Sequence, residues 1–173
     1  GFGILLRTRG YGLGWALAMS AFIYAGSMQY VAIDLLTGGA SLLTTAVTTL
    51  LVNARHLFYG ISMLERYRAA GRYAPYLIFS LTDETYSLVA AREDLTGAEC
   101  FRISLLDQLY WVLGTALGSL AGAYLDFNTT GIDFSLTALF LTVFTEQWLE
   151  TKDHAPALIG LGVSIVCRLL FGA

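Results

Sequence analysis

The sequence has few charged residues. Asp, Glu, Lys and Arg make up 13% of its 173 residues, about half of their share in an ordinary soluble domain. A disordered chain has the reverse composition, with many charges and few apolar residues, whereas 56% of these residues are hydrophobic. The net charge is −3 and the basic residues form no large cluster, so we expect no nucleic-acid partner.

Cysteine and histidine are also scarce. Cys100 and Cys167 lie far apart without a CxxC spacing, which speaks against a disulfide framework or a zinc motif. The histidines, His56 and His154, are distant too, and the sequence has no HExxH or GxSxG motif and no phosphate-binding glycine loop. We therefore expect no enzyme, no metal and no other cofactor. An intramembrane hydrolase that uses Ser27 and His56 is the least favoured alternative.

The main feature of the sequence is a set of long runs of uncharged residues. Gly10–Ile33, Leu35–Ala54 and Gln108–Leu125 contain 24, 20 and 18 residues without a formal charge. A bilayer-spanning helix needs about 20 apolar residues, and three such runs are difficult to bury in a soluble domain of this size. The sequence therefore predicts an all-α, polytopic integral membrane protein with helices broken near its polar patches.

We expect one transmembrane transporter domain over residues 1–173, trimmed at both ends. Six spans are predicted, at residues 13–36, 40–64, 73–91, 104–125, 132–149 and 155–173. The loops around Arg7 and Arg9 and at Glu65–Arg72 carry most of the basic residues, so the positive-inside rule places them in the cytoplasm. Asp107, near the start of a span, is expected to be solvated.

The first polar patch within a span is Tyr24–Tyr30 (YAGSMQY). Gly26 and Ser27 are small enough to let a helix or a ligand approach closely, and Gly26 favours a helix break that would expose backbone groups to a polar solute. Gln29 has both hydrogen-bond donors and acceptors. The alternative is a helix-packing patch with one interhelical hydrogen bond.

The second patch is Asn53–Gly60 (NARHLFYG). Arg55 has the forked geometry that binds a carboxylate, and His56 belongs to the residue type most often used to exchange protons. Asn53 and His56 share one helix face, and Arg55 and Tyr59 share another. The alternative places this patch at the membrane interface, with Arg55 extended toward the headgroups.

The third patch is Thr82-Asp83-Glu84-Thr85, which apolar residues flank on both sides. A charge at the centre of a bilayer costs about 3 kcal/mol on insertion scales, so two adjacent acids need a reason to be there. Asp83 and Glu84 are expected to bind an ammonium group, to carry a proton or to pair with Arg55. The alternative is one structural ion pair and one acid that reaches a loop.

Three glycines in the fourth span have the spacing of a helix-packing motif. Gly114, Gly118 and Gly122 form a doubled GxxxG, which lets two helix backbones come close. We expect this face to pack inside the bundle or against a partner, and a homo-oligomer is one alternative for that partner.

Together the motifs are similar to those of the AzlC family of branched-chain amino acid permeases. The segments that carry the resemblance, in order, are Tyr24–Leu43, Asn53–Met63, Phe79–Leu88 and Gly131–Phe144. The resemblance implies a multi-pass protein of the bacterial plasma (inner) membrane, the large subunit of a two-component permease with a small AzlD-type membrane subunit. It also implies transport, mostly export, of branched-chain amino acids. The sequence departs from the family in its extent at both ends and at Arg168, where an apolar residue is expected.

A transported amino acid is a zwitterion and needs receptors for both of its charges. We assign Arg55, with Asn53 and the Gly26–Ser27 backbone, to the carboxylate, and Asp83 or Glu84, with Gln29 and Thr82, to the ammonium. Phe22, Tyr24 and Tyr59 are predicted to form an apolar wall, and His56 or Glu84 to couple transport to protons. The remaining alternatives are a carrier for another small zwitterionic metabolite and an accessory membrane subunit without its own substrate path.

Overall fold

The computed structural model describes every residue except 91, 93, 125–130, 132–133, 151–153 and 172–173. The described residues form helices and connecting turns, and none of them lies in a strand, so the predicted all-α class is confirmed. The chain divides into two compact units, Gly1–Ile132 and Asp133–Ala173. Residues 91, 125, 132 and 173, which limit four of the predicted spans, lie outside the described residues.

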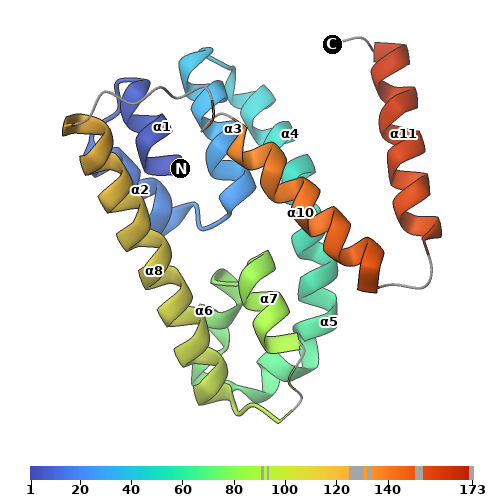
Figure 1. The fold of residues 1–173 in the computed structure, drawn as a ribbon. Coiled ribbons are helices and arrows are strands. Elements are labelled where there is room, and N and C mark those ends of the chain that lie inside the picture. Colours follow the sequence, from blue (N-terminus) through green and yellow to red (C-terminus); the bar gives the residue numbers. More distant parts are fainter. Residues whose placement is uncertain (91, 93, 125–130, 132–133, 151–153, 172–173) are drawn as a thin grey trace. The chain divides into compact units, whose positions relative to one another are not determined.

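The first unit contains eight α-helices and one 3₁₀-helix among its described residues (Figure 1). In chain order they are α1 (Phe2–Thr8), α2 (Leu13–Phe22), α3 (Gly26–Thr37), α4 (Leu42–Val52), α5 (Arg55–Ala69), η1 (Gly71–Tyr73), α6 (Ala74–Phe79), α7 (Asp83–Ala90) and α8 (Gly97–Tyr124).

Each of the first three predicted spans contains two helices instead of one. α2 and α3 occupy the first, α4 and α5 the second, and α6 and α7 the third. The junctions, at residues 23–25, 53–54 and 80–82, coincide with the three polar patches. The expected break beside Gly26 is observed, because Ala25 has an extended backbone (φ −148°, ψ 104°).

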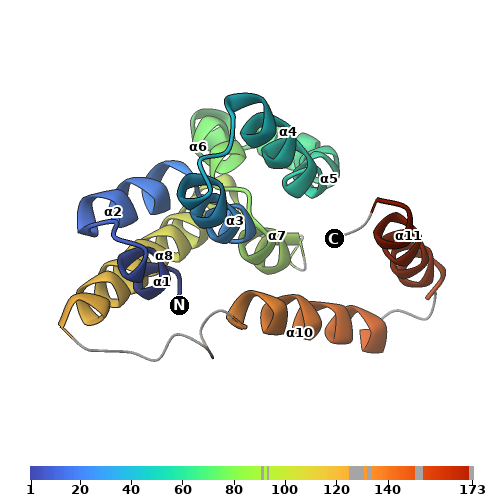
Figure 2. The same cartoon turned by 90° about the horizontal axis from the view of Figure 1, so that it is seen from above.

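The long helix α8 connects the two ends of this unit (Figures 1 and 2). Its C-terminal half packs against α1 and α2, and its N-terminal half packs against η1, α6 and α7. α8 begins with a capping box: the Glu99 amide donates to Thr96 Oγ1 (3.3 Å), and the Thr96 amide donates to Glu99 Oε2 (2.8 Å).

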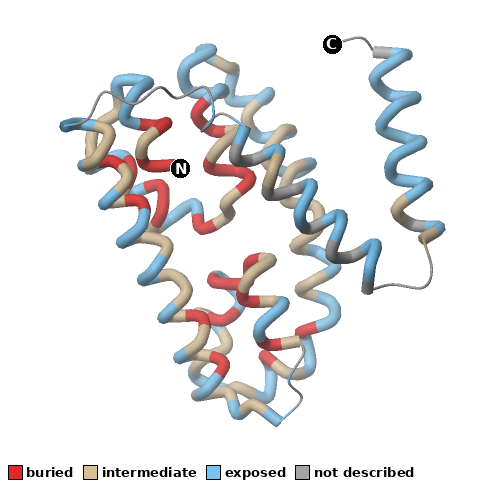
Figure 3. Tube along the Cα trace, in the orientation of Figure 1, coloured by how far each residue is buried: buried red, intermediate tan, exposed pale blue. Residues whose placement is uncertain are grey.

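Two hydrophobic clusters form the core, one toward each end of α8 (Figure 3). The residues of the first cluster, on α1 to α3, are Phe2, Leu5, Leu6, Ala16, Met19, Met28, Ala32 and Ile33. Those of the second, on α5 to α8 and the α6–α7 junction, are Met63, Tyr67, Leu77, Leu81, Val89 and Cys100.

The segment Glu65–Arg72 differs from its prediction as a loop. α5 continues through Ala69 and buries Tyr67 in the second cluster. Arg66 stabilises this arrangement because its guanidinium donates to the Val89 carbonyl at 2.6 Å and also to the Arg92 carbonyl. The hydrophobic pattern does not reveal this contact, since it depends on residues more than twenty positions away.

The second unit contains α10 (Ser135–Glu150) and α11 (Ala155–Phe171). The rings of Trp148 and His154 stack at a centroid distance of 4.0 Å, which fixes the end of α10 against the start of the next segment. Within the described residues of the whole chain, none of the helices combines the length and the hydropathy that a membrane span requires.

Candidate functional site

Three helices begin at the three polar patches, and contacts join their first turns. Ser27 lies in the first turn of α3, Arg55 begins α5 and Asp83 begins α7. Arg55 Nη2 donates to Ser27 Oγ at 2.5 Å, and Arg55 Nη1 forms an ion pair with Asp83 Oδ2. The N-termini of α3, α5 and α7 therefore meet at one guanidinium group.

The electrostatics of this meeting point follow from helix geometry. A helix N-terminus carries a partial positive charge and backbone N–H groups without intrahelical partners. It therefore favours the carboxylates of Asp83 and Glu84, both in the first turn of α7, and disfavours the cation of Arg55 at the first position of α5. The side chains of Arg55 and Asp83 are 27% and 32% exposed, so solvent screens the pair only in part and each charge stabilises the other.

The acids were expected in the middle of the third span, with a helix break nearby, and the structure places them at the start of the short helix α7. Thr82 and Thr85 define that start. The Thr85 amide donates to Thr82 Oγ1 (3.3 Å), and the Thr82 amide donates to Thr85 Oγ1 (2.8 Å). Thr85 Oγ1 also donates to the Ser80 carbonyl at 2.9 Å. Thr82 thus positions Asp83, and its own side chain is buried.

Gln29 closes the junction between α2 and α3. Its Nε2 donates to the carbonyls of Met19 (3.1 Å) and Ile23 (2.8 Å), which lie in the last turn of α2 and just after it. Gln29 is fully buried, and its Oε1 accepts a hydrogen bond from Trp111 Nε1 on α8 at 3.0 Å. Its amide therefore has three partners in the protein, and it supports the broken helix.

The other residues of the second patch surround Arg55. His56 Nδ1 lies 3.2 Å from the Asn53 carbonyl. Asn53 Oδ1 and Asp83 Oδ1 are buried, and no donor among the described residues binds either oxygen. Tyr59 stacks on Tyr86 with ring centroids 4.5 Å apart and interacts electrostatically with Asp83.

The three residues of the predicted apolar wall have different surroundings. Tyr24 is buried, and Tyr59 is half-buried beside Asp83. Phe22 is 80% exposed at the end of α2, so the structure does not place it in such a wall. The break at Ile23 turns the chain after Phe22, which a continuous helix would not do.

Asp107 is more enclosed than the sequence predicts. It is half-buried on α8 and accepts a hydrogen bond from the Tyr24 hydroxyl at 2.6 Å. Glu84 interacts electrostatically with both Asp83 and Asp107. The expectation of a solvated Asp107 was wrong because the α2–α3 break brings Tyr24 onto α8.

The sequence patterns did not predict the α8 residues that contact the helix junctions. Gln108 Nε2 donates to the Ala21 carbonyl (3.3 Å), and Gln108 Oε1 accepts from the Tyr76 hydroxyl (2.6 Å). Thr115 Oγ1 accepts from Ser20 Oγ (2.9 Å). Asp107, Trp111 and Thr115 follow one another at four-residue intervals, and this helical spacing of hydrogen-bonding groups in an apolar run is the signal that could have revealed them.

The three glycines of the doubled GxxxG have different surroundings. A Cβ on Gly118 would lie 3.4 Å from the Ile4 amide nitrogen, and one on Gly122 would lie 3.3 Å from Arg7 Cβ. Both glycines thus face α1. A Cβ on Gly114 would meet no atom of the described residues within 4 Å.

Comparison with known proteins identifies the family of the chain. A family model described as "AzlC protein" matches residues 1–125. The chain belongs to the AzlC family.

The described part of the structure contains no group of three or more His, Cys, Asp or Glu residues that could hold a metal ion.

Several known proteins are similar to this chain over nearly its whole length. The "Branched-chain amino acid transport protein AzlC" of Bacillus subtilis is 46% identical over 99% of this chain and 69% of its own length. An "Uncharacterized membrane protein" of Helicobacter pylori is 44% identical over 99% of this chain and 77% of its own. The "Inner membrane protein YgaZ" of Escherichia coli is 29% identical over 92% of this chain and 70% of its own. The chain is thus related to membrane proteins throughout, and no solved structure matches it.

Proposed function

We propose that this protein is the large subunit of a two-component permease that transports branched-chain amino acids, in the direction of export, across the bacterial inner membrane. The observation that carries the proposal is the Arg55–Asp83 ion pair where the N-termini of α3, α5 and α7 meet. The named activity of the Bacillus subtilis relative supports the substrate class.

The zwitterion binds by separating this ion pair. Its carboxylate takes the place of Asp83 at the Arg55 guanidinium, where Ser27 and the first backbone N–H groups of α3 add donors. Its ammonium group binds the released Asp83 carboxylate, which lies beside Tyr59. The exchange keeps every charge paired, so a doubly charged solute enters without leaving an unpaired ion in a low-dielectric site.

The remaining predicted residues act around this exchange. Asn53 extends the carboxylate receptor, and Gln29 and Thr82 act by supporting the helix junctions. Tyr59 provides apolar surface for the side chain beside Asp83. His56 or Glu84 takes up the proton that couples transport, and Gly118 and Gly122 form the face of α8 that packs on α1.

The exposed surface supports a location within the bilayer. Leu42, Leu43, Leu50 and Leu51 on α4 are 90%, 75%, 74% and 72% exposed. Such a density of exposed leucine exceeds what soluble monomers tolerate and marks a lipid or protein contact. We assign lipid and a small AzlD-type membrane subunit to these surfaces, in a multi-pass arrangement with the Arg7 and Arg9 loop in the cytoplasm.

A second candidate function is an accessory subunit without a substrate path, and the same ion pair favours it. Arg55 and Asp83 pair with each other in the structure, as a purely structural pair would. A structural pair has to be intact for folding and need not exchange with solute, so the two functions predict different results for conservative variants.

The test is efflux of leucine and valine from cells loaded with a leucine- or valine-containing dipeptide, with the small subunit co-expressed. We compare the unmodified protein with Asp83→Asn and Arg55→Lys. Asp83→Asn preserves the size of the side chain and removes its charge, and Arg55→Lys preserves the charge and removes the fork. Each variant is expected to lower efflux at least about tenfold, because each removes one charged contact with the substrate. The amount of protein in the membrane should be unchanged.

The matched control is Asp94→Asn, which removes an exposed carboxylate that precedes α8 and should leave efflux unchanged. Normal efflux by both site variants would overturn the carrier assignment. Normal efflux by Arg55→Lys alone would favour the accessory function, because an ammonium group can replace the guanidinium in a structural ion pair.

A further inference from the structure

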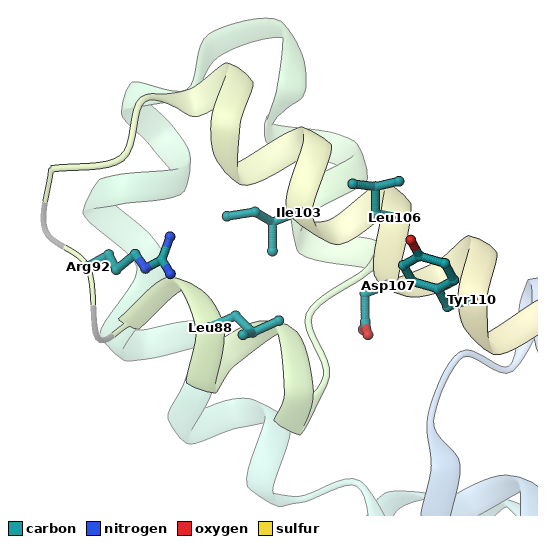
Figure 4. Close-up of a pocket in the computed structure, with 6 residues that line it drawn as sticks. All are labelled: Leu88, Arg92, Ile103, Leu106, Asp107 and Tyr110. Atoms are coloured by element: carbon teal, nitrogen blue, oxygen red, sulfur yellow. The ribbon is translucent and has the colours of Figure 1, made fainter.

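A pocket lies between α7 and α8, apart from the Arg55–Asp83 ion pair. It has a volume of about 250 Å³ and is lined by Leu88, Arg92, Ile103, Leu106, Asp107 and Tyr110 (Figure 4). Pockets for drug-sized molecules span about 300–1,000 Å³, so this pocket fits a smaller solute.

Its lining is apolar in the middle and charged at the two ends. Figure 4 shows Arg92 at one end and Asp107 at the other, with Leu88 and Ile103 between them. The ammonium and the carboxylate of an α-amino acid are bonded to the same carbon atom. An amino acid in this pocket therefore places a charged group at one end of the pocket and its aliphatic side chain in the middle.

The two charged ends are not equivalent. Arg92 is exposed, whereas Asp107 is half-buried and held in place by the Tyr24 hydroxyl at 2.6 Å. In the described part of the chain no salt bridge involves Asp107, and a second acid, Glu84, interacts with it electrostatically. A partly buried carboxylate needs a counter-charge more than an exposed guanidinium does. A cation is therefore expected to bind at the Asp107 end of the pocket.

We propose that this pocket is a second substrate subsite, in which Asp107 binds the ammonium group and Leu88, Ile103 and Leu106 contact the aliphatic side chain. This inference rests on the proposed function, because it assigns a second binding position to the same substrate class. Asp107 also bonds to Tyr24, two residues before Gly26 where α3 begins. Occupancy of the subsite is therefore linked through the α2–α3 junction to the Arg55 site.

The experiment uses two halves of leucine as probes on the purified full chain in detergent. Isopentylamine is leucine without its carboxylate, and 4-methylpentanoate is leucine without its ammonium group. Equilibrium binding of radiolabelled isopentylamine is expected to be saturable with one site per chain, and 4-methylpentanoate should not compete for it. Competition by 4-methylpentanoate at equal concentration would overturn the proposal, since it would show that the ammonium group is not what is recognised.

Variants at the pocket then locate the binding. Asp107→Asn retains an oxygen that can accept from the Tyr24 hydroxyl and removes the charge, and it should weaken amine binding at least about tenfold. Leu88→Trp fills the middle of the pocket from an exposed position on α7 and should weaken it to a similar extent without touching Asp107. Arg92→Gln is the matched control at the opposite end and should change binding less than about twofold. Unchanged binding by both Asp107→Asn and Leu88→Trp, or a loss in Arg92→Gln as large as in Asp107→Asn, would overturn the subsite.

Failure of the subsite can be told apart from failure of the proposed function. Leucine efflux by the unmodified protein together with no binding of the amine would remove the subsite and leave the carrier intact. Amine binding that depends on Asp107, without any leucine efflux, would uphold an ammonium-binding pocket and remove the carrier assignment on which its substrate role rests.

Discussion

Trp111 on α8 donates a hydrogen bond from its indole Nε1 to Oε1 of Gln29 on α3, 3.0 Å away and 82 residues earlier in the chain. The same Gln29 uses its Nε2 to bind the two carbonyls at the end of α2. One indole thus orients the buried amide that supports the first helix break, and through it the start of α3 that carries Ser27.

Replacing Trp111 with Phe should destabilise the protein. The variant leaves Gln29 Oε1 buried without its donor, and an unsatisfied buried acceptor costs about 1–3 kcal/mol. Thermal unfolding in detergent should show a lower midpoint for this variant. Trp15→Phe is the control, because Trp15 is 57% exposed, and an equal effect in both variants would contradict a specific role for the Trp111–Gln29 bond.

The all-helical fold and the location of the polar patches could be predicted because both are local properties of the sequence. Uncharged runs define helical segments, and Gly26 predicts the break that follows Tyr24. The other two breaks depend on capping interactions, such as the Thr82–Thr85 pair, which a hydropathy profile does not detect.

The partners of the patches could be predicted only in part, because they come from distant positions. Pairing of Asp83 with Arg55 was one of the expectations from the sequence, and the structure shows this pair where α5 and α7 begin. Asp107 was expected in solvent because its neighbours in sequence mark a span end, and its actual partner, Tyr24, is 83 residues away. Sequence periodicity assigns a residue to a helix face but does not identify the helix that covers that face.

Gly26 should not tolerate alanine. A Cβ at this position would lie 2.9 Å from the Trp111 ring, so the ring or α3 must move, and overpacking of this kind costs about 1–3 kcal/mol. Gly26→Ala should therefore lower both the unfolding midpoint and leucine efflux. In the Trp111→Phe background the smaller ring should reduce this cost, and a double-mutant cycle on unfolding free energies measures the difference. Strict additivity of the two changes would show that Gly26 and Trp111 do not interact.

The packing of α1 on α8 predicts opposite effects at two glycines. A Cβ on Gly3 would lie 2.2 Å from the Thr115 carbonyl oxygen, a backbone atom that cannot rotate away. Gly3→Ala should therefore separate the helices and strongly destabilise the protein. Gly114→Ala meets no atom of the described residues within 4 Å, so the better helix propensity of alanine should stabilise α8 by up to about 1 kcal/mol. Unfolding midpoints of the two variants check both signs, and a destabilised Gly114→Ala would indicate that a partner or second copy packs on this face.

The start of α8 should contribute a pH-dependent part of the stability. Hydrogen bonds from the hydroxyl and the amide of Thr96 lower the pKa of Glu99 below its ordinary value. Because the folded pKa is the lower one, this contribution is fully present above the unfolded pKa and is lost as the pH falls through the folded value. Glu99→Gln should therefore be less stable than the unmodified protein at about pH 6, and the difference should shrink at a pH below the ordinary pKa of glutamate. Unfolding midpoints at both pH values test this, and Thr96→Ala should show the same trend because it removes the hydroxyl donor of the pair.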